Sequence, residues 1–113
     1  MNELYSHGEV HVVQDPVIKE VGNTKVASIV GMTVESIGTG DTKKDIFSYF
    51  DFEVWDKAAE YIEKNLKKGD KFIVHSATPR QNRWEKDGEK HSKIVFRVRS
   101  FRVHSGKDSK ENA

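Results

Sequence analysis

Two large aromatic side chains on one predicted strand suit contact with a flat ligand. Tyr49 and Trp55 share one face of a segment whose other face carries Phe50, Phe52 and Val54. Because side chains alternate along a strand, the apolar face predicts burial and leaves Tyr49 and Trp55 toward water. One use for exposed rings is to stack on bases. The alternative is that a neighbouring strand, a loop or a second subunit covers them.

A third aromatic residue, Trp84, lies in a basic stretch just ahead of the turn dipeptide Asp87-Gly88. Rings interleaved with cations suit single-stranded nucleic acid, because a ring takes a base face and a cation takes a phosphate. A Trp near a hairpin tip is rarely in the core. The candidate nucleic-acid-binding residues are therefore these rings and the nearby cations of the hairpin, the last strand and a loop: Tyr49, Trp55, Trp84, Arg80, Arg83, Lys86, Arg97, Arg99, Lys43 and Lys44.

The net charge of +1 conceals an asymmetry along the chain. Residues 1–63 contain 5 Lys/Arg and 12 Asp/Glu, a balance of −7, whereas residues 64–113 contain 14 and 6, a balance of +8. Such a split favours one acidic and one basic surface, and a basic surface attracts phosphates. The alternative is two solvated faces that neutralise each other.

Several function classes lack a supporting pattern. The chain has no cysteine, and its five histidines show no metal-ligand spacing, so neither a disulfide nor a metal site is predicted. We find no paired carboxylates, nucleophile elbow or phosphate loop. The sequence therefore predicts a protein without catalytic residues or cofactor. The N-terminus lacks a signal-peptide pattern and no segment is long enough to span a bilayer, which favours a cytoplasmic protein.

The elements that position these residues follow from periodicity and turn signals. Strands are predicted at residues 4–13, 26–34, 46–55, 72–78 and 90–103, with a polar mobile loop at 38–45. Asp56 suits a helix N-cap, and Ala58, Ile62 and Leu66 repeat every four residues before Gly69. Asp87-Gly88 predicts a two-residue hairpin turn.

The last strand should present cations to one side. Ile94, Phe96 and Val98 share one parity, whereas Lys93, Val95, Arg97 and Arg99 share the other. Arg102 joins the second set only if a bulge interrupts the strand near Ser100.

Three strands, a helix and two strands are the element order of the OB-fold. The predicted fold class is therefore all-β with one short helix, a five-stranded Greek-key barrel. Its length suits one domain over residues 1–104, followed by a disordered C-terminal tail at 105–113.

The chain resembles the bacterial-type single-stranded DNA-binding protein family over residues 4–103. The resemblance rests on Asp15-Pro16, Val26-Ala27, the run VWDKAAEYIEKNLKKGDKFIV from Val54, and Arg83-Trp84 followed by Asp87-Gly88. It implies that Tyr49, Trp55 and Trp84 are the DNA-stacking aromatics. It also implies a homodimer or homotetramer and a role in DNA replication, recombination and repair.

The chain departs from the family pattern in three respects. A further stacking aromatic near the end of the second strand is replaced by Ile37, and the first-strand pairing used for dimerisation aligns poorly between Gly8 and Gln14. The Gly-rich linker and acidic C-terminal tip are not found, so any replication partner is expected to contact the barrel instead of such a tip. A short version of this kind resembles phage- or plasmid-borne members, or the related primosomal protein.

The leading prediction is sequence-independent binding of single-stranded DNA, which coats and protects exposed strands in the cytoplasm of a bacterial cell or a phage-infected host. One alternative is an OB-fold interaction module whose basic face docks an acidic replication partner. A second alternative is an RNA-binding OB-fold protein, because stacking on bases does not distinguish ribose from deoxyribose.

Overall fold

The computed structural model describes residues 3–105. They form one mixed six-stranded sheet that curls into a barrel, together with one α-helix. The elements in chain order are β1 (Ser6–Val12), β2 (Val17–Val21), β3 (Thr24–Ile37), the 3₁₀ turn η1 (Gly40–Thr42), β4 (Lys44–Trp55), α1 (Lys57–Asn65), β5 (Lys71–Lys86) and β6 (Glu89–His104).

Five of the strands close the barrel in the order β1-β5-β6-β4-β3, and β3 returns to β1 through the pairs His11–Met32 and Val12–Gly31. β4 and β6 are the parallel neighbours, and the other pairs are antiparallel. Closure removes most of the free sheet edges, which is how small barrels avoid edge-to-edge aggregation. The predicted OB-fold is therefore confirmed.

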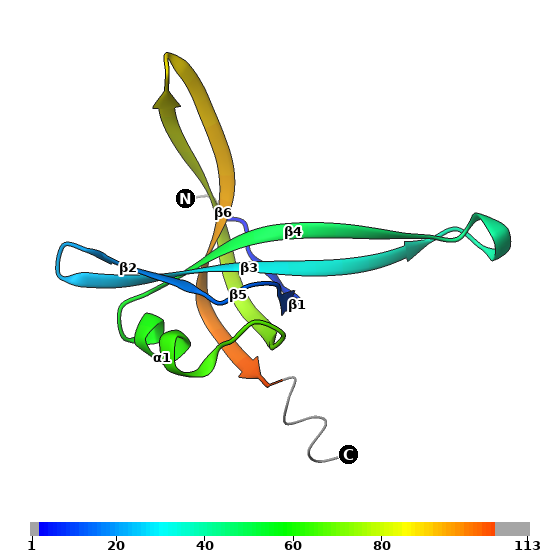
Figure 1. The fold of residues 1–113 in the computed structure, drawn as a ribbon, viewed down its shortest axis with the longest axis horizontal. Helices are drawn as coiled ribbons and strands as arrows, with labels where there is room; N and C mark the ends of the chain where they lie inside the picture. Colours follow the sequence, from blue (N-terminus) through cyan, green and yellow to red (C-terminus); the bar gives the residue numbers. More distant parts are fainter. Residues whose placement is uncertain (1–2, 106–113) are drawn as a thin grey trace.

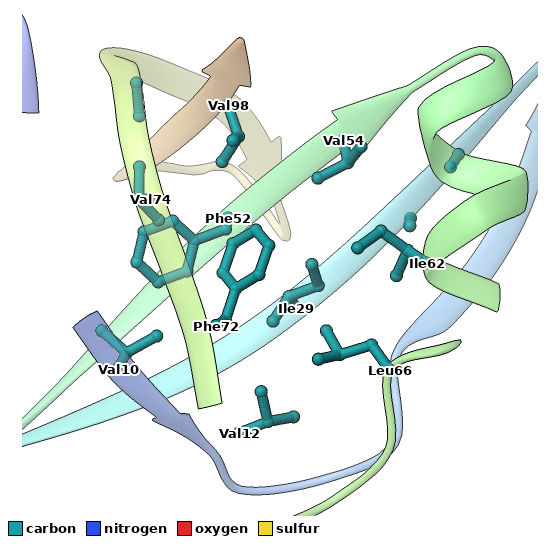
Figure 2. Close-up of a cluster of buried hydrophobic side chains, with 13 residues drawn as sticks. Val10, Val12, Ile29, Phe52, Val54, Ile62, Leu66, Phe72, Val74 and Val98 are labelled. Carbon is teal, nitrogen blue, oxygen red and sulfur yellow. The ribbon is translucent and has the colours of Figure 1, made fainter. Parts of the chain in front are cut away.

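The barrel is filled by inward side chains of its five closing strands and of the α1 segment (Figure 2). Phe52 and Phe72 meet edge to face with ring centroids 5.7 Å apart. Gly31 lets β1 cross closely over β3, because a Cβ atom built there would lie 2.3 Å from the Cγ2 atom of Val10. A larger residue at this position would push the two closing strands apart.

Helix α1 packs against β3 and β4 at one end of the barrel (Figure 1) and buries Ala59 and Ile62. Asp56 occupies the predicted N-cap position, but its side chain makes no capping hydrogen bond. Its backbone carbonyl accepts from the Ala59 amide at 3.0 Å, and its φ of 62° turns the chain sharply out of β4. The helix start predicted from the sequence is thus correct, although the hydrogen bond at this start is made by the Asp56 backbone carbonyl and not by its side chain.

Two hairpin arms extend beyond the barrel, one made by β3 and β4 and the other by β5 and β6 (Figure 1). The β5–β6 arm turns at Asp87 (φ 54°) and Gly88 (φ 80°), between the paired residues Lys86 and Glu89. Positive φ at both central residues is typical of the type I′ turn that Asp-Gly favours. The predicted hairpin is confirmed.

The elements differ from the sequence prediction in their extent as well as in number: β3 spans Thr24–Ile37 instead of 26–34, and β5 spans Lys71–Lys86 instead of 72–78, because each continues into an arm beyond the barrel. Strand β2 was not predicted, because its five residues alternate poorly; it pairs only with β3, outside the closed barrel. The predicted loop at 38–45 shrinks to the short turn η1, since β3 and β4 pair as far as Ile37 and Lys44. Except for Ser105, the predicted tail lies outside the described residues.

Candidate nucleic-acid interface

One continuous outward surface runs across β3, β4, β6 and β5, in that order. The pairing register between neighbouring strands arranges the side chains of this surface in rows, because residues directly opposite each other lie on the same face of a sheet. One row joins Asp51 of β4, Val95 of β6 and Arg80 of β5, and the next joins Glu53, Arg97 and Thr78. We call this surface the outer face. It brings together residues far apart in the chain, such as Ser28 and Arg97, which are 69 positions apart.

Strand β4 supplies most of the rings of the outer face. Tyr49 is 62% exposed, as its parity predicted. Phe47, two residues earlier and paired with Val34, is 55% exposed on the same side. Phe47 was not among the predicted site residues, although the same alternation places it there. It supplies a ring in the arm where Ile37 stands in place of the family aromatic.

Trp55 is the most enclosed ring of the outer face. The Arg97 guanidinium lies over it, 5.4 Å from the ring centroid, and its Nε1 donates to Glu53 Oε1 at 3.3 Å. Val26 of β3 lies directly opposite and is buried. A cation over an indole face is an attractive contact. A base that stacks on that face of Trp55 must therefore displace Arg97.

Trp84 lies on the β5–β6 arm, four residues beyond Arg80 on the same side of β5. It is 44% exposed, and its cross-strand partner His91 stacks on it at a centroid distance of 5.6 Å and an interplanar angle of 20°. Trp84 therefore lies outside the core, as its position near the predicted hairpin turn indicated. The sequence alone does not indicate that His91 stacks on Trp84, because only the pairing register of β5 and β6 places the two side chains side by side.

Two acidic groups of this surface lie near cations. Lys93 Nζ lies 3.9 Å from Asp51 Oδ2, and Glu53 faces Arg97 across the parallel pair. An exposed pair of this kind contributes little to stability and can be replaced by another anion. The cations of the outer face are thus partly neutralised while no phosphate is bound.

Strand β6 follows its predicted alternation with two exceptions. Val95 lies on the outward side but is buried, at 4% exposure, between Asp51 and Arg80 of the neighbouring strands. Ile94 has core parity but is 50% exposed, because it lies in the β5–β6 arm where the barrel core has ended. Alternation predicts the face of a side chain, but neighbouring strands determine its burial.

Three predicted cations lie off the outer face, although Lys44 is only three residues from Phe47. Lys44 pairs with Ile37 at the far end of the β3–β4 arm, about 36 Å along β4 from Trp55 at 3.3 Å per residue. Lys43 lies in the adjoining turn. Arg83 has the opposite parity to Trp84, and its guanidinium donates to Gln81 at 2.8 Å. Lys86 shares the side of Trp84, at the start of the hairpin turn.

Arg99 lies beside the N-terminal segment instead of the aromatic rings. The Tyr5 hydroxyl donates to the Glu3 carboxylate, and this hydrogen bond raises the pKa of the Tyr5 phenol, while the nearby Arg99 charge acts in the opposite direction. Arg99 also falls where the β5–β6 register shifts, so the bulge that the sequence left open is present. Arg99 therefore borders the outer face without contacting its rings.

The described residues offer no other obvious chemistry. Within residues 3–105, no group of three or more His, Asp or Glu side chains could hold a metal ion. In the same part of the chain, no helix has the length and apolar character needed to cross a membrane. The outer face is the surface where rings and cations gather.

The closed barrel, with its helix between β4 and β5 and its aromatic outer face, defines an OB-fold protein. The chain belongs to the single-strand binding protein family, which it matches over residues 7–104. This match confirms the resemblance drawn from the sequence, and with it single-stranded DNA binding as the class of function. A search of the curated proteins found no match.

Solved structures share the fold at low sequence identity. A Plasmodium falciparum SSB in complex with ssDNA is 21% identical, with a TM-score of 0.77 over 93% of this chain and 98% of that chain. A small single-stranded DNA-binding protein from Streptomyces coelicolor is 16% identical, with a TM-score of 0.69 over 96% and 99%. A Thermus aquaticus protein, 18% identical, gives 0.73 over 88% of this chain but only 49% of its own.

Proposed function

We propose that the outer face binds single-stranded DNA without sequence specificity and without catalysis. The observation that carries this proposal is the gathering of four rings and the neighbouring cations on one side of a continuous sheet. The rings are Phe47, Tyr49, Trp55 and Trp84, and the cations are Arg80, Lys86, Lys93 and Arg97. Every base has a flat face, so stacking gives affinity without sequence specificity.

The arrangement also suggests how binding proceeds. Phosphates compete with Asp51 for Lys93 and with the Trp55 ring for Arg97, and a displaced Arg97 uncovers the indole of Trp55. The two exposed arms offer Tyr49 and Trp84 to bases without any such rearrangement. We infer that the arms make the first contacts and that Trp55 engages after Arg97 moves to a phosphate.

Titration of the full chain with labelled oligo-dT, oligo-rU and duplex DNA, at several salt concentrations, tests this function. We expect tight binding of oligo-dT, weak binding of the duplex, and a fall of log affinity with log salt of about 0.7 per phosphate contact. Arg97→Glu should make that slope shallower by about 0.7, whereas Lys64→Glu on the exposed side of α1 should not. Duplex bound as tightly as oligo-dT would contradict the proposal, and preference for oligo-rU would favour RNA.

We further propose that the protein acts as a homodimer or homotetramer in the cytoplasm during replication or recombination. Beyond its pairing with β3 at His11 and Val12, β1 leaves one edge without a strand partner among the described residues. A 280 Å³ cavity, lined in part by Phe50, Phe52 and Phe96, opens beside that edge. An edge next to an apolar hollow supports pairing with a second copy. Light scattering would measure the mass, and a monomer at micromolar concentration would contradict this assembly.

A further inference from the structure

The stacking of His91 on Trp84 gives this indole a fixed neighbour on the β5–β6 arm. The two residues lie directly opposite each other in the antiparallel register, and their ring centroids are 5.6 Å apart at an interplanar angle of 20°. Among residues 3–105, Phe47, Tyr49 and Trp55 stack on no other ring. Trp84 therefore differs from the other rings of the outer face, because one side of its indole is already covered by a ring of the protein.

The hairpin turn determines that His91 is this neighbour. Asp87 and Gly88 form the whole loop, and Trp84 and His91 are the third pair of strand residues counted from it. A two-residue loop leaves no slack between the strands, so it fixes which residues face each other. The pair is thus set by the backbone of the arm, before any ligand is present.

The other face of the Trp84 indole is open. β1 pairs with β5 only as far as Ser6 and Ala77, so within residues 3–105 no strand pairs with β5 on that side at Trp84. The residue is 44% exposed even though His91 covers one face of its ring. A base can therefore stack on the face that points away from β6 without displacing His91.

Charge also favours the open face. Lys86 follows Trp84 by two residues on the outward side of β5. On the opposite side of the ring pair, the Glu89 carboxylate lies 3.9 Å from His91 Nε2. Lys93, which also points outward from β6, already faces a carboxylate of β4 at 3.9 Å. A phosphate is attracted to the cation of β5 and repelled by Glu89, so the attached base is directed to the Trp84 side of the pair.

The stacked imidazole orders the indole before DNA arrives. An exposed side chain on a two-stranded arm can occupy several rotamers, because no core packs around it. Binding must then fix one rotamer, and this ordering lowers the affinity. Stacked aromatic rings attract each other, so His91 holds the Trp84 ring in one orientation. Less ordering is left for the ligand to impose.

We propose that His91 is a positioning residue for single-stranded DNA: it holds Trp84 in the orientation in which a base stacks on the open indole face, and it stays stacked in the complex. The proposal rests on the proposed function, because it concerns the same surface and the same ligand. Base, indole and imidazole then form a continuous stack of three rings. His91 acts through Trp84 and does not itself contact the DNA.

Two substitutions separate the ring of His91 from its place in the strand. His91→Thr removes the ring but keeps a residue that favours β-strands, whereas His91→Phe keeps a ring. The matched control is His75→Thr, which makes the same change at an exposed histidine of β5. His75 precedes Trp84 by nine residues, about 30 Å along the strand at 3.3 Å per residue.

Anisotropy of a labelled oligo-dT of about 8 nucleotides, which falls within the span of one OB-fold, measures the affinity. His91→Thr should weaken binding about 2- to 12-fold, the range that corresponds to ordering one side chain. His91→Phe and His75→Thr should bind as the unaltered chain does. Circular dichroism checks that each variant keeps the barrel.

Three results of this titration would overturn the proposal. They are an unchanged affinity of His91→Thr, an equal loss in His91→Phe, and a gain in His91→Thr, which would show that the imidazole covers the face that a base takes. Failure of the unaltered chain to bind oligo-dT would instead contradict the proposed function.

A double-mutant cycle tests whether His91 acts through Trp84. In Trp84→Ala no indole is left to position, so adding His91→Thr should cause no further loss of affinity. The same loss in both backgrounds would show that His91 contacts the DNA directly, and this would refute the positioning role.

Fluorescence reports the motion of the ring itself. The chain has two tryptophans, so Trp55→Phe leaves Trp84 as its single indole. In this background and without DNA, His91→Thr should lower the anisotropy of the Trp84 fluorescence, and His91→Phe should restore it. An anisotropy that does not change in His91→Thr would overturn the proposal even if the affinity fell.

Discussion

The barrel and its two arms share the same alternation of apolar and polar side chains, but the apolar side chains are buried in the barrel and exposed in the arms. In the barrel, one side of each strand packs into a core where Ile29 and Phe72 are fully buried. In the arms no core lies beneath the strands, so Val34, Phe47 and Trp84 remain 44% to 55% exposed. Apolar side chains in the arms therefore contribute little to folding and are available to a ligand.

The comparison extends to the rings themselves. Trp55 stands on the barrel and is held by Arg97 and Glu53, whereas Tyr49 and Trp84 stand where the sheet leaves the barrel. Rings on the barrel are pre-positioned but covered, and rings on the arms are uncovered but attached to two-stranded ribbons, which are marginally stable on their own. Substitutions in the two regions should thus separate stability from binding.

The largest effect is expected in the barrel. Phe72→Ala should lower the free energy of unfolding by about 3–5 kcal/mol, because it removes a fully buried ring and leaves a cavity. Phe47→Ala in the arm should lower it by less than about 1 kcal/mol. Denaturant titration by circular dichroism measures both, and comparable losses at the two positions would show that the arm has a core of its own.

The next effect concerns binding by the arm. Trp84→Ala should weaken single-strand binding by about 1–3 kcal/mol, or roughly 5- to 150-fold, and leave the barrel folded. Trp84→Phe, which keeps a ring, should retain most of the affinity. Anisotropy of a labelled oligo-dT measures the affinity. An unfolded Trp84→Ala protein would place the ring in the structural part of the molecule.

A smaller effect is expected for the ring on the barrel. Trp55→Ala should weaken binding less than Trp84→Ala, since a base gains the indole face only by displacing Arg97. It should also remove a cation–π contact of about 0.5–1 kcal/mol from the free protein. A double-mutant cycle with Arg97→Ala, measured with and without oligo-dT, would test this coupling. Additive losses in the free protein would show that the two side chains do not interact.

The smallest effect should be a gain. Glu53→Gln removes a negative charge from the row of Arg97, so that charge no longer repels a phosphate bound there. We expect oligo-dT affinity to rise by roughly 0.2–1 kcal/mol, or up to about fivefold, and more so at low salt. Glu63→Gln, at the exposed pair with Lys25 away from the rings, is the matched control. Equal gains from both variants would indicate a general effect of net charge.

Local patterns predicted much of the barrel and part of the site. Alternation along β4 correctly assigned Phe52 and Val54 to the core and Tyr49 to the outside. The Asp87-Gly88 turn and the helix start at Asp56 also follow from residue type alone. These features depend on contacts within a few residues, which the sequence displays directly.

Other features required contacts between distant segments. Phe47 was not named as a site residue, although the strand predicted at residues 46–55 contains it and the alternation places it on the side of Tyr49; its pairing with Val34 in the β3–β4 arm leaves the ring exposed on the outer face. Lys43 and Lys44 were included because a mobile loop predicted at residues 38–45 could bring them to a ligand, yet that segment is the tight turn at the end of the β3–β4 arm, about 36 Å along β4 from Trp55 at 3.3 Å per residue.

The sequence by itself determined which side chains could share a face within each strand, because a two-residue period needs no partner. Only the tertiary structure decided which faces meet. The parallel pairing of β6 with β4 places Arg97 over Trp55, and the bulge at Ser100 directs Arg102 outward toward His7 and His75. Register between strands far apart in the chain is set by how the core closes, and no local period encodes it.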